Sequence, residues 1–296
     1  MIKKQLIAYS FIIVSLLTLL ILVYRPMLTT IKYSMYKVGM LGFGEEFIGL
    51  GNYKMLFSQS AFWKSIYNTI ILSLFGLLTI PIGFLLAVMI NSIGKGKLQG
   101  FFRVGFYLPN IITGVSVILI FQVVLMGNGG LLNSFLSFLT GREITIGWLA
   151  DSRYAKIGAT ILWCWMNMGY SMLMNLSSMQ AIPMELYDAA SVDGAGTLKK
   201  LFYITIPNMK SCFSLLLITG MINGLARFTD IYIIGGSSTS GGAGGSLQTI
   251  LMYIFQFSFE TPNYGVSSAG SMVLFVLVFL LTMVNVKLTG FLNDEV

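Results

Sequence analysis

The sequence predicts an all-α fold, a polytopic membrane bundle of about six transmembrane helices. The first observation is composition: 56% of the 296 residues are hydrophobic and 10% are charged, whereas soluble domains carry roughly 25% charged residues. The second is a mean hydropathy of +0.82. The third is that apolar stretches long enough to span a bilayer recur along the whole chain. We therefore expect one transmembrane domain over residues 1–296.

A helix needs about 20 mostly apolar residues to cross the hydrocarbon core. The stretches that qualify are 6–28, 63–92, 102–126, 156–180, 209–228 and 266–289. The first is too long for the apolar part of a signal peptide, and no small-residue cleavage site follows it. Residues 247–259 are apolar but too short to span, so a partly inserted or interfacial helix is expected there. Pro81 and Pro109 should bend their helices.

Charge and cysteine usage exclude several classes of function. The net charge of +7 comes without a basic cluster, which argues against nucleic-acid binding and favours loops facing lipid head groups. The chain contains no histidine. Its two cysteines, Cys164 and Cys212, lie in apolar stretches as small buried residues, so no disulfide, metal site or catalytic residue is expected.

The segment 182–207 between the fourth and fifth predicted spans differs from the other loops. It is too polar to enter lipid and contains three of the eleven acidic residues of the chain. Pro183 suits a helix start, with Glu185 and Asp188 near the positive end of the helix dipole. Asp193 and Gly194 predict a turn, after which a second short helix should run until Pro207 breaks it. The pattern predicts a helix–turn–helix suited to docking on another surface.

Within this segment, Asp188-Ala189-Ala190 is followed after three residues by Gly194 and after nine more by Ile204-Thr205-Ile206-Pro207. This spacing resembles the EAA loop of ATP-binding-cassette importer permeases, with Asp188 in place of Glu and Ile206 in place of Leu. Tyr187, Asp193, Ala195 and Phe202 are similar to the maltose-type, binding-protein-dependent sugar permeases. The same resemblance extends to Gly49-Leu50-Gly51-Asn52-Tyr53, Phe101-Phe102-Arg103, Gly130-Leu131-Leu132-Asn133 and Arg227-Phe228-Thr229-Asp230.

The resemblance implies a permease subunit of an ATP-driven importer for a sugar or oligosaccharide. It implies a second homologous permease, two cytoplasmic ATPase domains and an extracytoplasmic solute-binding protein as partners. Residues 182–207 would then form a cytoplasmic coupling helix. Both termini would face the cytoplasm of a bacterial or archaeal inner membrane. Counting Lys and Arg on the two sides does not decide the orientation. The alternative is that the segment packs on its own bundle.

The source of energy for transport is predicted from two features that the sequence does not contain, a phosphate-binding loop and acidic residues within the spans. Without a Gly-x-x-x-x-Gly-Lys-Ser/Thr phosphate loop, the chain should bind no cofactor itself, and ATP and Mg²⁺ are expected in the partner ATPase. All acidic residues lie outside the predicted spans, which argues against a proton-coupled carrier. The chain is therefore predicted to be a transport subunit and not an enzyme. Two alternatives remain: an importer of another polar solute such as glycerol phosphate, and a stand-alone secondary carrier.

Polar residues inside spans predict where a solute passes. Four of them recur every four residues in the fourth span and form one slanting stripe, because each step drifts only about 40° around a helix. An aromatic ring with amides suits a sugar, whose CH face stacks while its hydroxyls form hydrogen bonds. The stripe equally suits helix–helix packing. Arg227 and Asp230 are expected to form an ion pair. The solute-path candidates are Gln122, Trp163, Asn167, Ser171, Asn175 and Asn223.

Overall fold

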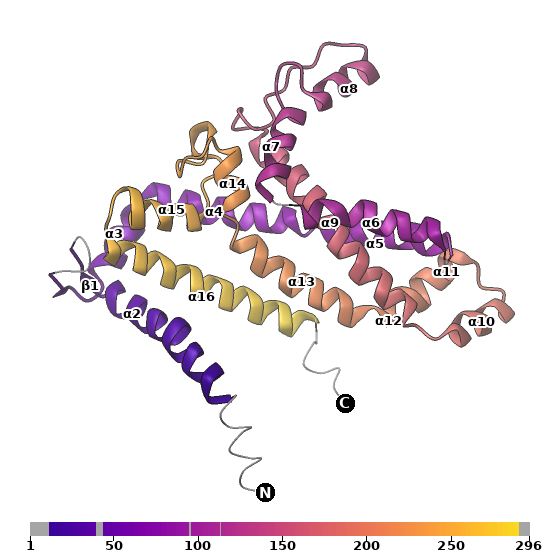
Figure 1. The fold of residues 1–296 in the computed structure, drawn as a ribbon, viewed down its shortest axis with the longest axis horizontal. Helices are drawn as coiled ribbons and strands as arrows, with labels where there is room; N and C mark the ends of the chain where they lie inside the picture. The colour runs from indigo at the N-terminus through magenta and orange to yellow at the C-terminus, as the bar shows by residue number, and fades with distance from the viewer. Residues whose placement is uncertain (1–11, 40–43, 95, 113, 290–296) are drawn as a thin grey trace, which may run out of the picture. The chain divides into compact units, whose positions relative to one another are not determined.

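The structure, a computed structural model, describes residues 12–39, 44–94, 96–112 and 114–289. Nearly all the regular structure is helical (Figure 1), which confirms the predicted fold class. In the described part of the chain, strands are limited to a hairpin of β1 (Tyr36–Lys37) with β2 (Glu46–Phe47). The chain divides into two compact units, residues 1–64 with 253–277, and residues 65–252 with 278–296.

Unit 1 contains the first predicted span and the loop that follows it. Its helix runs from Ile12 to Ser34 and ends in α2 (Arg25–Ser34). The predicted end at residue 28 is too early. A π-helical turn at Leu20–Tyr24 precedes Pro26, which occupies the first turn of α2. There a missing backbone N–H is tolerated.

A single amide organises the loop after this helix. Asn52, in α3 (Gly51–Ser58), donates from Nδ2 to the backbone oxygens of Ser34 at 3.0 Å and Tyr36 at 2.9 Å. Gly265, at the start of α16 (Tyr264–Thr289), lies so close that an added Cβ would be 2.5 Å from the Tyr36 oxygen. The Gly-Leu-Gly-Asn-Tyr motif therefore ties the first helix to the last.

The second predicted span is the helix Ser60–Ser92, made of α4 (Ser60–Gly76) and α5 (Thr79–Ser92). Its break falls at residues 77–78, close to the position where the ring of Pro81 would clash with the carbonyl four residues earlier. The third predicted span is two helices, α6 (Lys97–Ile111) and α7 (Gly114–Val124), bent by 98°. The bend expected at Pro109 thus appears just after it.

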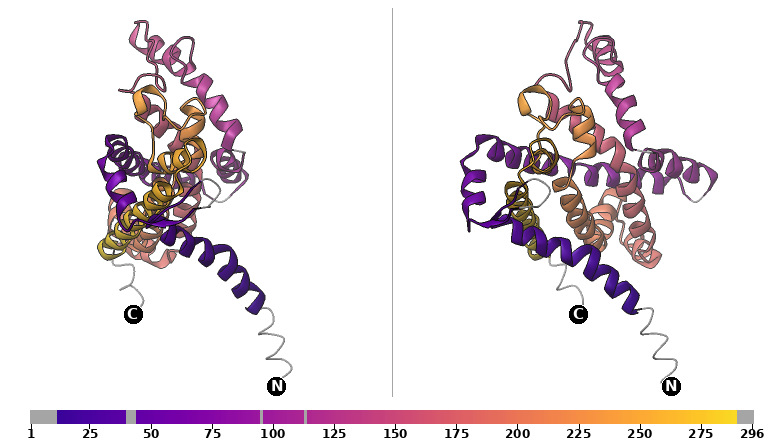
Figure 2. Two further views of the ribbon diagram at one scale, coloured as in Figure 1. Left: turned by 90° about the vertical axis from the view of Figure 1, so that its left-hand side faces the viewer. Right: turned by 60° about the vertical axis from the view of Figure 1, so that its left-hand side comes forward.

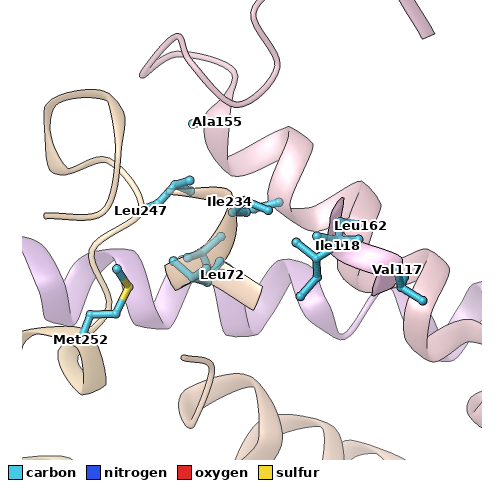
Figure 3. Packing of buried hydrophobic residues seen from close by; sticks show 10 residues of the cluster. Leu72, Val117, Ile118, Ala155, Leu162, Ile234, Leu247 and Met252 are labelled. Atoms are coloured by element: carbon cyan, nitrogen blue, oxygen red, sulfur yellow. The ribbon is translucent and has the colours of Figure 1, made fainter. Parts of the chain in front are cut away.

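Unit 2 is built around α9 (Ala155–Gln180), which packs mainly on α5 and α6 and less extensively on α7 and α13 (Lys210–Leu225). Glycines allow the tightest contacts: an added Cβ on Gly169 would lie 2.1 Å from the Phe106 oxygen. Close approach of small residues is the usual way in which membrane helices associate. Figure 3 shows one apolar cluster in this unit, including Leu72, Ile118, Leu162 and Ile234.

Judged by length and composition, three described helices can cross a membrane, or up to five if each bent pair counts as one span. They are Ile12–Ser34, Ser60–Ser92 and Tyr264–Lys287, with α6–α7 and the pair Thr197–Asn208 and Lys210–Leu225 as the bent ones. Helix α9 is long enough at 26 residues, but its polar stripe makes it less apolar. The short apolar segment predicted around 247–259 forms α15 (Ile250–Phe255) and a π turn, Gln256–Glu260. Six spans therefore stay a prediction.

Candidate functional site

The segment 182–207 folds as the predicted helix–turn–helix. Helix α10 (Met184–Val192) starts after Pro183, and Glu185 lies in its first turn. The helix ends at Val192, and Gly194, two residues later, has a φ of +73°. The Gly194 N–H donates to the Ser191 oxygen at 3.1 Å, and the Ala195 N–H donates to the Ala190 oxygen at 2.8 Å. These two bonds form a Schellman motif, which requires a left-handed residue at the turn.

The second arm begins with α11 (Thr197–Lys200), continues through a π turn at Leu201–Thr205 and ends in α12 (Ile206–Asn208). The second arm does not stop before Pro207 as predicted. Pro207 lies in the first turn of α12, where a missing backbone N–H is tolerated, and the helix breaks two residues later, before α13. The Tyr187 and Thr205 hydroxyls are hydrogen-bonded at 2.9 Å, and the Lys200 ammonium donates to the Ser191 hydroxyl. These contacts join the two arms into one structural unit.

Most of the motif faces outward, and Tyr187 in the first arm and Ile204 in the second anchor it. Tyr187 packs against a buried cluster that includes Met179, Ile182 and Met209, so the first arm is fixed to the transmembrane helices. An added Cβ on Gly194 meets no atom within 4 Å. The exposed motif residues are Glu185, Asp188, Ala189, Asp193, Gly194, Phe202 and Pro207, while Tyr187, Ala190 and Ala195 are half-buried.

Large apolar side chains also project from this unit. Val192 is 89% exposed, Tyr203 80% and Phe202 61%. Figures 1 and 2 show α10 at one end of unit 2 and α8 (Leu131–Thr140) at the opposite end. A helix–turn–helix that is anchored on one side and exposes large apolar side chains on the other has a surface suited to docking.

The structure divides the polar stripe of α9 into two parts. Trp163, Asn167 and Ser171 line a small recess together with Thr219 and Asn223 of α13. The recess has a volume of about 40 Å³, which is room for about one water molecule. In this conformation it therefore holds no sugar, although its lining combines an indole ring with amides and hydroxyls.

Two predicted path residues lie elsewhere. Asn175 is buried, and its amide donates to the Ser171 oxygen at 2.8 Å. Helix α5 packs tightly beside it, since an added Cβ on Gly83 would lie 2.5 Å from the Ser171 hydroxyl. Gln122 of α7 donates to the Ile233 oxygen at 3.0 Å and borders a different hollow. These positions indicate helix packing for Asn175 and loop attachment for Gln122.

The expected ion pair of Arg227 with Asp230 is confirmed. Arg227 Nε and Nη2 lie 2.9 and 2.5 Å from Asp230 Oδ2, with side-chain exposures of 0% and 8%. Removing one partner of a buried pair typically costs about 3–5 kcal/mol. The guanidinium also stacks on the Trp163 ring, 4.4 Å from its centroid. Sequence reasoning missed this contact, because the two residues lie on different helices and no periodic pattern links them.

Comparison with known proteins agrees with these features. The family described as "Binding-protein-dependent transport system inner membrane component" matches residues 79–289. The multiple sugar-binding transport system permease protein MsmF of Streptococcus mutans is 28% identical, with 95% of this chain and 94% of that protein aligned. The trehalose/maltose transport system permease protein MalF of Thermococcus litoralis is 29% identical, with coverages of 99% and 96%.

A solved structure also shares the fold. A chain from the crystal structure of a bacterial transporter that imports the acidic polysaccharide alginate superposes with a TM-score of 0.83 at 23% identity, with 97% of this chain and 96% of that chain covered. The family match spans the helix–turn–helix, the recess and the buried ion pair. The chain thus belongs to the family of inner membrane components of binding-protein-dependent transport systems.

Proposed function

We propose that this chain is the permease subunit of an ATP-driven importer whose solute is a sugar or oligosaccharide. The observation that carries the proposal is the exposed helix–turn–helix at residues 184–208, which has the motif of a coupling loop and is anchored to the bundle through Tyr187. Its partners would be a second homologous permease, two ATPase domains that bind ATP and Mg²⁺, and an extracytoplasmic solute-binding protein.

In this account, ATP-driven movement of the ATPase domains is transmitted through α10. Tyr187 joins α10 to the buried cluster around Met179 and to the second arm through Thr205. A displacement of α10 would therefore move the ends of α9 and α13, two of the helices that line the recess. The docking end of unit 2 would lie in the cytoplasm with both chain termini, and α8 would lie on the outer side.

The sugar assignment is supported by the lining of the recess and by the names of the relatives. In the complex reconstituted with its binding protein, Asn167→Ala is expected to change which neutral oligosaccharides stimulate ATP hydrolysis. The effect on any one sugar should be roughly 2- to 10-fold, because one net hydrogen bond is worth about 0.5–1.5 kcal/mol. Asn110→Ala serves as the control, since Asn110 is an exposed amide of α6 that does not line the recess.

The same assay separates the alternatives. Stimulation by glycerol phosphate and not by oligosaccharides would favour an importer of phosphorylated solutes. Uptake that persists without the ATPase subunits would favour a stand-alone carrier. If Asn167→Ala and Asn110→Ala give the same sugar profile as the parent, the recess is not part of the solute path.

A further inference from the structure

The buried pair of Arg227 and Asp230 lies where α13 gives way to α14 (Thr229–Ile234). Arg227 Nη2 also donates to the Ala159 oxygen of α9 at 3.1 Å, and the Thr249 hydroxyl donates to the Arg227 backbone oxygen at 3.0 Å. One residue thus contacts α9, α14 and the segment before α15. Its position directly follows the part of α13 that lines the recess.

The pair is not optimised for stability alone. Arg227 Nη1 is buried and makes no hydrogen bond to any residue that the structure describes. Burying two charges costs several kcal/mol each, and well-packed apolar residues of similar volume often serve a fold equally well. Packing alone therefore does not require a guanidinium at this position.

The guanidinium covers the aromatic ring of the recess. It lies 4.4 Å from the centroid of Trp163, in the geometry of a cation–π contact. The indole also has Gly76 against its nitrogen, since an added Cβ there would lie 3.0 Å from Nε1. Asn223 lies four residues before Arg227, in the last turn of α13, and lines the same recess. The ring is thus held between the end of α4 and the guanidinium.

We propose that Arg227, oriented by Asp230, is a positioning residue that holds Trp163 in the closed form of the recess. The guanidinium occupies one face of the indole, so the ring cannot turn away from its place beside α4 while this contact is made. This inference rests on the proposed function, because it assumes that the recess is part of the solute path. Opening then requires that the guanidinium leave the ring.

The test uses the assembled complex and needs no solute. Cysteine is placed at Asn167 after Cys164→Ala and Cys212→Ala, and the rate of reaction with a small methanethiosulfonate reagent is measured. Asn167 is half-buried and its amide donates to the Trp163 oxygen at 2.9 Å, so the closed recess should react slowly. Arg227→Lys keeps a cation beside Asp230 but loses the planar stacking surface. It should raise the rate about tenfold without lowering the thermal unfolding midpoint.

A second variant and a control complete the design. Arg227→Met with Asp230→Asn removes both charges together and should raise the rate at least as much. Cysteine at Phe138, which is 84% exposed in α8 and does not line the recess, should react at one rate in every background. Equal rates at Asn167 in all backgrounds would overturn the inference. A faster rate accompanied by a lower unfolding midpoint would also overturn it, because the pair would then be structural. Failure of the sugar assignment would change none of these rates.

Discussion

The Gly194→Trp complex is expected to lose solute uptake, to background or at least about 10-fold below the parent, while the transmembrane helices still insert. Gly194 has a φ of +73°, where a residue with a Cβ costs roughly 1–2 kcal/mol. An added Cβ meets no atom of the described residues within 4 Å, so a side chain here would leave the Schellman turn in an outward direction. Bulk at this point would keep a docking partner away from α10.

Two variants separate strain from bulk at this turn. Asn tolerates the left-handed conformation, so Gly194→Asn should retain much more uptake than Gly194→Trp. Gly196 has an ordinary φ of −71° and open space around it, so Gly196→Ala should behave like the parent. The measurement is ATPase retention during purification together with uptake in vesicles. Normal retention and normal uptake in Gly194→Trp would show that the loop does not couple the two subunits.

Gly169→Leu is expected to have the largest effect on stability. An added Cβ on Gly169 would lie 2.1 Å from the Phe106 backbone oxygen and 2.7 Å from its carbonyl carbon. These are backbone atoms of α6, so α6 and α9 would have to separate. Overpacking a core typically costs about 1–3 kcal/mol, and a displaced helix should bring the cost to the upper end or prevent assembly.

The thermal unfolding midpoint of the purified complex checks this prediction. Gly100→Ala is the matched control, because Gly100 lies in α6 with no atom within 4 Å of an added Cβ. That change should leave the midpoint unchanged or raise it slightly, since Ala favours the helix. An unchanged midpoint in Gly169→Leu would contradict the close approach of the two helices.

Local signals in the sequence were sufficient for the helix–turn–helix. Pro183 and Gly194 act through backbone geometry that depends on near neighbours, and each lies where its chemistry predicts, whereas the second arm continues through Pro207 to Asn208. The Arg227–Asp230 pair was predictable for the same reason, because its partners are three residues apart. The all-α class was predictable from the long apolar stretches, because a helix satisfies all the backbone N–H and C=O groups of such a stretch within lipid.

Features that depend on contacts between distant segments were not predictable. The spacing of the α9 stripe did not reveal that Trp163 and Asn167 border a recess while Asn175 packs beside α5. That division depends on where α5 and α13 lie. The first helix continues to Ser34 with a π turn before Pro26. The local sequence pattern does not predict this π turn. The bend between α6 and α7 falls a few residues after Pro109. The proline therefore predicts roughly where the chain bends but not the angle of the bend.

The most direct test of the central claim places a photo-cross-linking amino acid at Ala189, on the exposed side of α10, in the intact complex. Phe138 of α8 is the control position, since it is 84% exposed at the opposite end of unit 2 (Figure 1). The account predicts that Ala189 cross-links to the ATPase subunit and that Phe138 does not. Cross-linking to the ATPase from Phe138, or its absence from Ala189 in a complex that hydrolyses ATP, would contradict the proposed role of residues 182–207.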